Sequence, residues 1–427
     1  MGHFLKCVCA SLLLLTFPIA ILDAQEADDW SRFRGPNGSG VAEGIELPER
    51  PMSHVAWRQP LPIGHSSPIV SKNRLYVQSA DSEAGRQTLH CFDAATGETL
   101  WERSTEFEPY RIHERNSHGS ATPAADDSGV YLVWGSVAEN RIVKFNHDGT
   151  KQWEREVGGF QCNHGSAVAL VIVDGMVICP LMEEAPKGGK SDRKIDPRIL
   201  ALDDESGELR WTAQRPQGKA SFSTPCVIGE GDDKELIFCN TADGMFSLSP
   251  KDGSENWALP VFERRTVSST VLAGDLLIGS NGSGGGGNYL VAVRPGKKPE
   301  EVYRVRQAPY VPTPLFKDGM LFLWNDKGIA SCVDAATGEL HWRERVGGSS
   351  SASPVCIGNR LVCIDDSGEA FVIAASKEYQ LHGKFSLGAT TRSTPAVHSD
   401  RQENTEHVYF RTESELIAIK AEPTDDK

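Results

Sequence analysis

A short motif recurs along the 427-residue chain and constrains its fold more than any other feature. The two clearest copies are Asp93-Ala-Ala-Thr-Gly-Glu-Thr-Leu-Trp101 and Asp334-Ala-Ala-Thr-Gly-Glu-Leu-His-Trp342. The Asp side chain can accept hydrogen bonds from the turn amides, Gly permits a positive φ, and an aromatic residue follows in the next strand. Each copy therefore predicts a tight β-hairpin. With looser copies included, the motif residues are Asp93, Gly97, Trp101, Trp153, Asp203, Gly207, Trp211, Trp257, Asp334, Gly338 and Trp342.

A second marker, a hydroxyl residue followed by Pro, precedes an apolar strand in most units. It occurs at Ser67, Thr122, Thr224, Thr313, Ser353 and Thr394, with degenerate copies at Val168-Ala169 and Ser269-Thr270. Successive markers lie roughly 40 to 55 residues apart, a period typical of propeller blades. Each unit has room for four short strands, so the chain is predicted to be an all-β, eight-bladed β-propeller of four-stranded antiparallel blades. We expect the marker hydroxyls to satisfy backbone groups near the axis.

The two ends of the repeat region predict how the ring closes. The last unit, Thr394 to Ala421, has three strands, whereas His54 to Gln59 contains Trp57 and resembles the missing fourth strand. If the N-terminal strand completes the last blade, residues 54–421 form a closed ring without a free sheet edge. Trp57 and the motif tryptophans, with Tyr303 in the fifth unit, are then expected to pack between neighbouring blades.

The N-terminal sequence has the features of an export signal. A short start with one Lys, an apolar stretch from Cys7 to Leu22 and a small residue at Ala24 predict a signal peptide over residues 1–24. Residues 25–53 form a lead segment, and residues 422–427 a polar tail. The net charge of −14, without a basic run, excludes nucleic acid as a main partner. We expect an exported monomer in the periplasm or at the cell surface, with no membrane span after signal removal; retention of the signal as an anchor stays open.

Eight cysteines follow the signal, and none of them forms a CxxC pair. Export would permit disulfides, for example between Cys226 and Cys239 or between Cys356 and Cys363. Cys91 and Cys332, however, occupy the same position in two repeats, which favours a role as small buried apolar residues.

The Asp-x-x-Thr-Gly-x-x-x-Trp unit resembles the pyrroloquinoline-quinone (PQQ)-like β-propeller repeat family over about Val55 to Ala421. The segment from Trp30 to Gly40 is similar to a prefix found on such proteins from planctomycete-type bacteria. The resemblance implies either a quinoprotein dehydrogenase of alcohols or sugars, or a non-enzymatic protein similar to BamB, the outer-membrane-assembly lipoprotein. Because one fold serves both, function has to be argued from the site.

The residues favour the non-enzymatic alternative. The resemblance would imply an adjacent Cys-Cys disulfide and a catalytic Asp with an Asn/Glu calcium shell, and neither is matched in this sequence. No CxxCH haem motif occurs. No catalytic residue can be assigned and no cofactor is predicted; PQQ and calcium apply only if the protein is a divergent quinoprotein oxidoreductase.

The long loops gather on one face of the predicted propeller, where function concentrates on a rigid scaffold. They span 104–119, 158–165, 180–198 and 281–288; the last contains the glycine run Gly282–Gly287, which we expect to be a flexible tip. Because equal phases of a repeat lie on one ring, side chains from several blades should meet in a central funnel that could bind an anionic or polyhydroxylated ligand. Its candidate residues are His65, His113, Asn116, His118, His164, Arg264, Arg265, Tyr310 and Arg392.

These histidines have two interpretations. They could line a ligand site, or each could simply cap a strand by bonding a loop carbonyl. A metal site has little support, since no His pair shows metal-motif spacing. Our hypothesis is an exported scaffold that recognises an envelope or extracellular protein or glycan through the long-loop face. The alternative is a PQQ-dependent oxidoreductase, and the sequence does not identify the partner.

Overall fold

The computed structural model describes residues 30–162, 164–185, 194–400 and 405–424. The predicted signal, residues 1–24, lies outside the described residues. Within the described part of the chain, no helix is long and apolar enough to cross a membrane.

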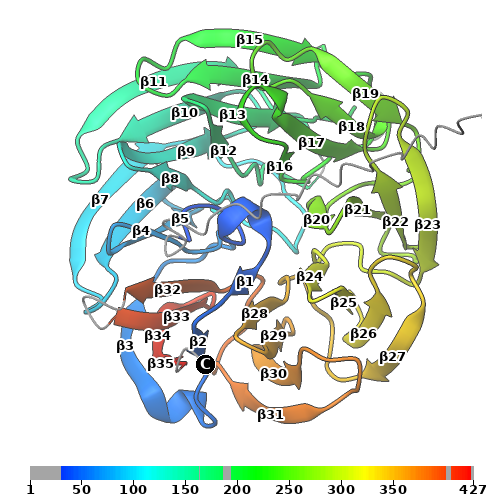
Figure 1. Ribbon diagram of the computed structural model, residues 1–427. Helices are drawn as coiled ribbons and strands as arrows, with labels where there is room; N and C mark the ends of the chain where they lie inside the picture. The colour runs from blue at the N-terminus through cyan, green and yellow to red at the C-terminus, as the bar shows by residue number, and fades with distance from the viewer. Residues whose placement is uncertain (1–29, 163, 186–193, 401–404, 425–427) are drawn as a thin grey trace, which may run out of the picture.

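The chain forms a ring of eight four-stranded antiparallel blades around a central axis, which confirms the predicted fold (Figure 1). Blade 1 contains β4 (Ile69–Ser71), β5 (Arg74–Asp81), β6 (Arg86–Asp93) and β7 (Thr99–Glu106). Blade 2 contains β8 (Ala124–Asp126), β9 (Gly129–Gly135), β10 (Asn140–Phe145) and β11 (Lys151–Gly158). Blade 3 contains β12 (Val171–Val173), β13 (Met176–Leu181), β14 (Arg198–Asp203) and β15 (Leu209–Gln214). Blade 4 contains β16 (Cys226–Ile228), β17 (Glu235–Asn240), β18 (Gly244–Leu248) and β19 (Glu255–Leu259), with η3 (Gly231–Asp233) between its first two strands.

The second half of the ring repeats the same order, with each innermost strand coming first in the sequence. Blade 5 contains β20 (Val271–Ala273), β21 (Leu276–Asn281), β22 (Tyr289–Arg294) and β23 (Glu300–Arg306). Blade 6 contains β24 (Leu315–Lys317), β25 (Met320–Trp324), β26 (Ile329–Asp334) and β27 (Leu340–Arg345). Blade 7 contains β28 (Val355–Ile357), β29 (Arg360–Ile364), β30 (Glu369–Ala374) and β31 (Leu381–Ser386). Blade 8 contains β32 (Ala396–Asp400), β33 (Thr405–Arg411) and β34 (Glu415–Lys420).

The N-terminal strand β3 (Val55–Pro60) closes the ring as the fourth strand of blade 8. It pairs antiparallel with β34, and Arg58 lies opposite Ile417. The indole of Trp57 lies 5.7 Å from the Tyr409 ring at a tilt of 39° and donates a hydrogen bond to the Ala94 carbonyl of blade 1. The strand pairing and the aromatic contact hold β3 within blade 8, and the indole hydrogen bond to Ala94 joins that blade to blade 1.

The turn glycines and the aromatic residues of the repeat depend on each other. A Cβ added at Gly97 would lie 2.5 Å from the Trp57 ring of the preceding blade, and the φ of Gly97 is +74°. The same arrangement recurs where a turn glycine meets the aromatic ring of the blade before it, in the pairs Gly149–Trp101, Gly207–Trp153, Gly253–Trp211 and Gly338–Tyr303. Trp257 differs, because its indole donates to the Glu235 carboxylate of its own blade. The glycine and the aromatic residue of the motif are therefore the residues through which one blade contacts the next.

The marker hydroxyls form a series of hydrogen bonds around the axis that is interrupted at blade 3, where the marker position is Ala169. The backbone N–H of one marker donates to the hydroxyl of the marker in the next blade, as from Thr313 to Ser353 at 2.9 Å and from Ser353 to Thr394 at 3.0 Å. The series also continues across the chain ends, where the Thr394 N–H donates to Ser67. Further links join Ser67 to Thr122, Thr224 to Ser269 and Ser269 to Thr313. These hydroxyls satisfy buried backbone donors, as expected from the sequence.

The start of the lead segment crosses the central channel. Residues 30–40, the axial segment, include η1 (Pro36–Gly38) and lie over the ring's centre in Figure 1. The Trp30 carbonyl accepts from the Val70 N–H of blade 1, and the Ser31 carbonyl from the Ala125 N–H of blade 2. The Asn37 side chain exchanges two hydrogen bonds with the Val227 backbone of blade 4. The axial segment thus closes one end of the channel.

Arg34 anchors the axial segment to blades 6 and 7. Its guanidinium is fully buried and donates to five carbonyls, with distances between 2.8 and 3.4 Å. Burial lowers its pKa to about 9, so the group stays cationic at neutral pH. The five acceptors are Gly38, Ser39, Thr313, Pro314 and Pro354.

The rest of the lead segment continues onto the same end of the ring. Strand β1 (Val41–Ala42) pairs parallel with β28 and gives blade 7 a fifth strand. Strand β2 (Ile45–Glu46) pairs with β35 (Glu422–Pro423), so part of the segment predicted as a polar tail is a strand. The 3-10 helix η2 (Pro51–His54) then leads into β3.

The hydrophobic core lies within and between the blades rather than in one centre. One cluster joins blades 7, 8 and 1 with Trp30 of the axial segment. The eight cysteines that follow the predicted signal are free and buried. Burial raises the pKa of Cys91 to about 12, as it does for a thiol used as a small apolar side chain.

Candidate functional site

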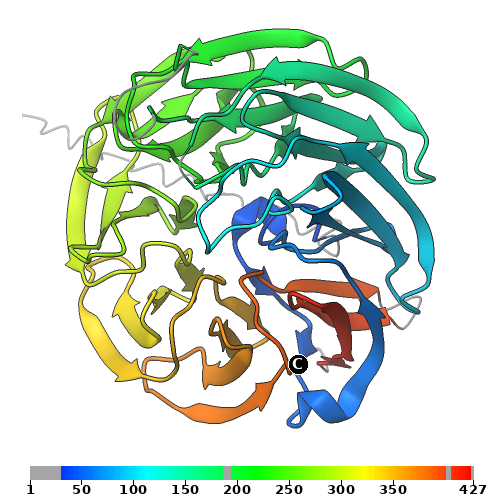
Figure 2. The ribbon, with the colours of Figure 1, turned by 180° about the vertical axis from the view of Figure 1, so that it is seen from behind.

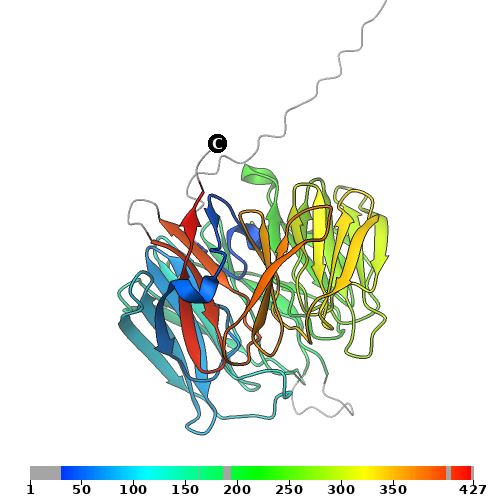
Figure 3. The same ribbon diagram turned by 90° about the horizontal axis from the view of Figure 1, so that it is seen from below.

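A funnel-shaped cavity of about 1250 Å³ opens at the end of the axis opposite the axial segment. We call the loops that lead into each innermost strand the mouth loops, and they lie on the face seen in Figure 2. Figure 3 shows the ring from the side, with β35 at one end of the axis and the β7–β8 loop at the other. Phe33 of the axial segment lies at the floor of the funnel and is half-buried. The cavity is therefore closed at one end by the chain itself.

Two rings of equivalent residues make up the funnel wall. The marker ring consists of the eight marker positions, and the upper ring consists of the residues two places before them. The marker ring is Ser67, Thr122, Ala169, Thr224, Ser269, Thr313, Ser353 and Thr394; the upper ring is His65, Ser120, Ala167, Phe222, Val267, Val311, Ser351 and Arg392. All eight upper-ring residues are half-buried, and the residue after each of them is buried. The repeat phase therefore selects which side chains face the funnel.

The upper ring has two unlike halves. Blades 3 to 6 contribute Ala167, Phe222, Val267 and Val311, which form an apolar wall. Blades 7, 8, 1 and 2 contribute Ser351, Arg392, His65 and Ser120, which form a polar wall. The funnel thus presents an apolar surface on one side and hydrogen-bonding groups on the other.

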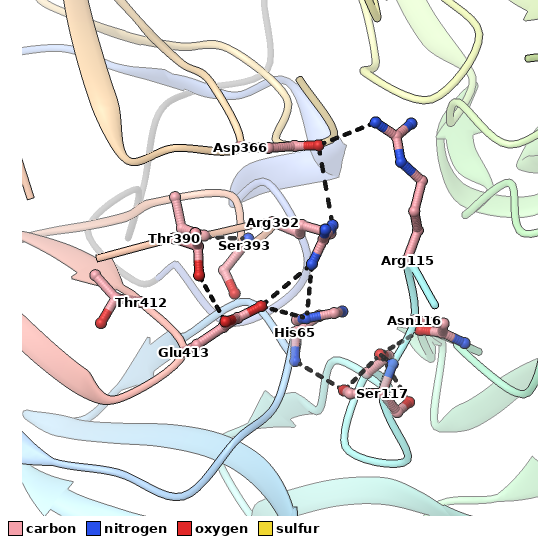
Figure 4. A network of polar contacts seen from close by, with 12 residues as sticks. His65, Arg115, Asn116, Ser117, Asp366, Thr390, Arg392, Ser393, Thr412 and Glu413 are labelled. Atoms are coloured by element: carbon pink, nitrogen blue, oxygen red, sulfur yellow. Dashed lines mark hydrogen bonds and ion pairs between the residues drawn. The ribbon is translucent and has the colours of Figure 1, made fainter. Parts of the chain in front are cut away.

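A charged network spans the polar wall (Figure 4). Glu413 lies 3.2 Å from Arg392 and 3.6 Å from the His65 ring nitrogen Nε2. Asp366 joins Arg392, at 3.9 Å, to Arg115 of the β7–β8 loop, at 3.3 Å. The His65 backbone N–H donates to the Ser117 hydroxyl, which fixes the loop against the ring. Blades 7 and 8 are thereby connected to the loop that enters blade 2.

His65 is held neutral in this network. Burial is the main cause that lowers its pKa to about 4, and the cations Arg392 and Arg411 act in the same direction against the opposing charge of Glu413. A neutral imidazole can donate at one nitrogen and accept at the other. At neutral pH it therefore serves as a hydrogen-bonding group and not as a cation.

This low pKa predicts acid sensitivity. Between about pH 6.5 and pH 4 the unfolded chain takes up a proton on His65 and the folded chain does not, so the free energy of unfolding falls as the pH falls. We expect a loss of about 2 kcal/mol from this group. Urea unfolding at pH 7, 5.5 and 4.5 measures it, and His65→Asn should reduce the slope while His382→Asn, an exposed control, should not. Equal slopes in the two variants would contradict the assignment.

A second ion pair supports the opposite side of the mouth. The Arg265 guanidinium donates to both oxygens of Glu184 at 2.7 and 2.6 Å, and the Glu184 side chain is almost fully buried. Asp326 accepts hydrogen bonds from the backbone N–H groups of Tyr310 and Val311 at 2.7 and 2.9 Å. The Arg265–Glu184 pair connects blades 3 and 5, and the Asp326 carboxylate holds the loop that enters blade 6.

The glycine run between β21 and β22 lines the funnel and is bonded to a neighbouring mouth loop. Arg264 donates to the Ser283 hydroxyl and to the Gly286 carbonyl, both at 3.1 Å. A Cβ at Gly287 would lie 2.8 Å from the Arg264 guanidinium. This contact was not predicted from the sequence, because Arg264 belongs to another mouth loop.

The structure brings eight of the nine candidate residues into the funnel lining. They are His65, His113, Asn116, His164, Arg264, Arg265, Tyr310 and Arg392. The rings of His113 and His164 lie 4.8 Å apart, and the Asn116 amide donates to the His164 carbonyl. His118 lies elsewhere: its ring bonds the Ser82 hydroxyl and the Tyr110 carbonyl. For His118, strand capping describes the contacts better than ligand binding.

Sequence reasoning missed the floor and the second layer of the site. Phe33 belongs to the lead segment, to which no site was assigned. Glu413, Asp366 and Glu184 pair with funnel arginines, but they lie far from them in the sequence. One pattern in the sequence could have identified the funnel wall: the residue two places before each marker lies in that wall.

The funnel is basic although the chain is acidic. Among the described residues, seven Lys or Arg side chains and two Asp or Glu side chains line it, whereas acidic residues outnumber basic ones 58 to 44 in the whole chain. Asp366, Glu413 and Glu184 neutralise three of these arginines from behind. Four cations at the mouth make no ion pair with any described residue: Lys219, Arg264, Lys327 and Arg345. A concave basic surface attracts anions.

The donor set does not fit a calcium-bound quinone. Calcium takes six to eight oxygen ligands, several of them carboxylates. Over the ranges that the structure describes, no group of three or more His, Cys, Asp or Glu side chains is placed to hold a metal ion. The two lining acids are Glu263 and Asp326, and both oxygens of Asp326 already accept backbone hydrogen bonds.

An eight-bladed propeller with a polar funnel at its axis defines a class that includes both enzymes and assembly proteins. A sequence profile described as outer membrane protein assembly factor BamB matches residues 51–190, 85–298 and 304–422. The chain therefore belongs to this family of PQQ-like β-propellers. No curated protein matches the chain.

Solved structures of similar fold are distant in sequence. The quinohemoprotein alcohol dehydrogenase ADHIIG from Pseudomonas putida HK5 has a TM-score of 0.66 and 10% identity, over 94% of this chain and 81% of that one. BamB from Moraxella catarrhalis has a TM-score of 0.57 and 14% identity, over 87% and 100%. The designed protein Ika8 has a TM-score of 0.59 and 13% identity, over 88% and 100%. At such identities the likeness extends to the fold alone.

Proposed function

We propose that this protein is an exported, non-enzymatic binding or assembly propeller whose ligand, part of an envelope or extracellular protein or glycan, enters the funnel from the long-loop face. One observation carries the proposal: a wide basic cavity is closed at its floor by the axial segment and surrounded at its mouth by long loops. A blind cavity of this kind suits holding a ligand rather than passing it through the ring.

The way the walls are built supports a binding role. Arg392 and Arg265 are held by Glu413 and Glu184, so their positions are set before any ligand arrives. A preorganised site loses less conformational entropy on binding. The family description, outer membrane protein assembly factor, supports an envelope location. So does the N-terminal sequence, whose apolar stretch is typical of an export signal.

Hydrogen–deuterium exchange tests this proposal without knowledge of the ligand. The purified chain is mixed with envelope fractions, separated into protein and glycan, and the exchange of its amides is compared with that of the free chain. We expect slower exchange in residues 110–120, 263–267 and 282–288, because their loops surround the mouth. Protection confined to the outer strands β7, β15 and β31 would overturn the proposal, since these strands lie on the rim of the ring.

The alternative is a divergent PQQ-dependent oxidoreductase of alcohols or sugars. Its support is the fold shared with quinohemoprotein alcohol dehydrogenases and the cationic funnel, which suits an anionic cofactor. Calorimetric titration with PQQ, with and without calcium, separates the two. We expect no saturable binding and no dye-linked oxidation; saturable, calcium-dependent binding together with oxidation of an alcohol or sugar would establish the alternative.

A further inference from the structure

The funnel has a chemical asymmetry that narrows its ligand. The apolar wall of blades 3 to 6 consists of Ala167, Phe222, Val267 and Val311, and the aromatic ring of Phe33 adds an apolar floor. Below the wall, the marker ring supplies seven hydroxyl groups on buried residues. Six of these hydroxyl groups accept one backbone N–H each, and a hydroxyl can form further hydrogen bonds beside that one. A ligand that fills this space needs flat apolar faces and many hydroxyl groups on one framework.

The unpaired cations stand at the mouth on the same side as the apolar wall. Lys219 and Arg264 lie in the loops before blades 4 and 5, and Lys327 and Arg345 belong to blade 6. None of the four makes an ion pair within the described part of the chain, although the chain is strongly acidic. Arg264 and Arg345 each use the nitrogen Nη1 to bond their own loops, which leaves other guanidinium N–H groups to bind carboxylate or sulfate. The ligand therefore also needs anionic groups at its outer edge.

The size of the cavity favours several sugar rings over one. Its volume of about 1250 Å³ is larger than the 300–1,000 Å³ typical of a site for one small molecule. Sugar rings combine apolar C–H faces with equatorial hydroxyl groups, which matches a wall of Val, Ala and Phe next to a ring of Ser and Thr. An acidic peptide would match the cations, but it has few hydroxyl groups for the marker ring.

We propose that the ligand is an anionic oligosaccharide, carrying carboxylate or sulfate groups, whose sugar faces lie on the apolar wall and whose charges meet the mouth cations. This inference rests on the proposed function, because it names the ligand class of the same funnel.

Isothermal titration of the purified chain with defined oligosaccharides tests the ligand class. The anionic probes are hexamers of galacturonate and mannuronate, which carry only carboxylates, and of chondroitin sulfate, which carries both carboxylate and sulfate groups. The neutral probe is the methyl-esterified galacturonate hexamer, and hexaglutamate represents an acidic peptide. We expect saturable binding of at least one anionic hexamer, at least tenfold weaker binding of its neutral counterpart, and weaker binding as salt is raised.

Variants locate the contacts. The pair of substitutions Arg264→Gln and Arg345→Gln should weaken binding at least tenfold, and Val267→Asp should abolish it by placing an acid on the apolar wall. Arg294→Gln is the matched control, because Arg294 is an exposed arginine at the end of β22, paired with Asp275 and Glu300 outside the funnel. Each variant is first checked for a wild-type thermal transition.

Three results would overturn the inference: equal binding of the neutral hexamer, tighter binding of hexaglutamate, or no binding of any anionic hexamer. In each of these cases the proposed function still stands if an envelope fraction protects the mouth loops from exchange. If that protection is also absent, both fail, so the two outcomes can be told apart.

Discussion

Replacing Arg34 with Met should lower the free energy of unfolding by about 3 kcal/mol or more. The Arg34 guanidinium donates to five buried carbonyls, and a buried acceptor left without a donor costs about 1–3 kcal/mol. Replacing a buried ion pair by apolar residues can be harmless when both partners are removed. Here the acceptors are backbone carbonyls, so they remain in place and unpaired after the substitution.

Urea unfolding of Arg34→Met and of Arg34→Lys measures this effect. Lysine keeps the charge but reaches fewer of the carbonyls, so we expect an intermediate loss of stability. Arg294→Met, at an exposed position, is the control and should unfold like the wild type. Wild-type stability of Arg34→Met would show that the axial segment is not needed to hold blades 6 and 7 together.

Replacing Gly97 with Ala should destabilise the protein by about 3 kcal/mol. Two effects add: a positive φ of +74°, costing about 1 kcal/mol, and a Cβ placed 2.5 Å from the Trp57 ring, where overpacking costs about 1–3 kcal/mol. Because Trp57 comes from the strand that closes the ring, this strain falls on the contact between the first and last blades.

Gly319→Ala is the matched control for this substitution. Gly319 has the same φ of +74°, and a Cβ there would meet nothing within 4 Å. The difference between the two variants in thermal or urea unfolding isolates the contact with Trp57. If both variants lose the same stability, the proposed dependence of the turn glycine on the preceding aromatic residue is wrong.

The propeller could be predicted because its determinants are local and repeated. In the copy from Asp93 to Trp101, for example, Gly97 packs against the aromatic ring of the preceding blade, and Trp101 contacts the next blade. Part of the funnel lining could also be predicted from the sequence, because a residue two places before a marker faces the axis in every blade. His65 and Arg392 were assigned to the funnel because both lie in loops that enter an innermost strand, although their partners could not be predicted.

The features of the fold and the site that were not predicted depend on contacts between residues far apart in the sequence. Arg34 bonds Pro354 across 320 positions, and no local pattern reports such a contact. His118 departs from the funnel because its loop is long enough to fold back, where Phe107 and Tyr110 pack against the ring. The contacts of the glycine run that begins at Gly282 could not be predicted, because Arg264, its partner, belongs to a different loop.

Blocking the funnel is the most direct test of the proposed ligand site. The chain is immobilised through its C-terminus, since β35 lies at the end of the axis opposite the mouth (Figure 3), and exposed to the envelope fractions. Val267→Trp fills the upper ring, and Leu381→Trp adds the same bulk to the exposed outer strand β31. We expect Val267→Trp to lose at least nine-tenths of the bound material and Leu381→Trp to retain it. Full binding by Val267→Trp, or loss only in Leu381→Trp, would place the ligand outside the funnel.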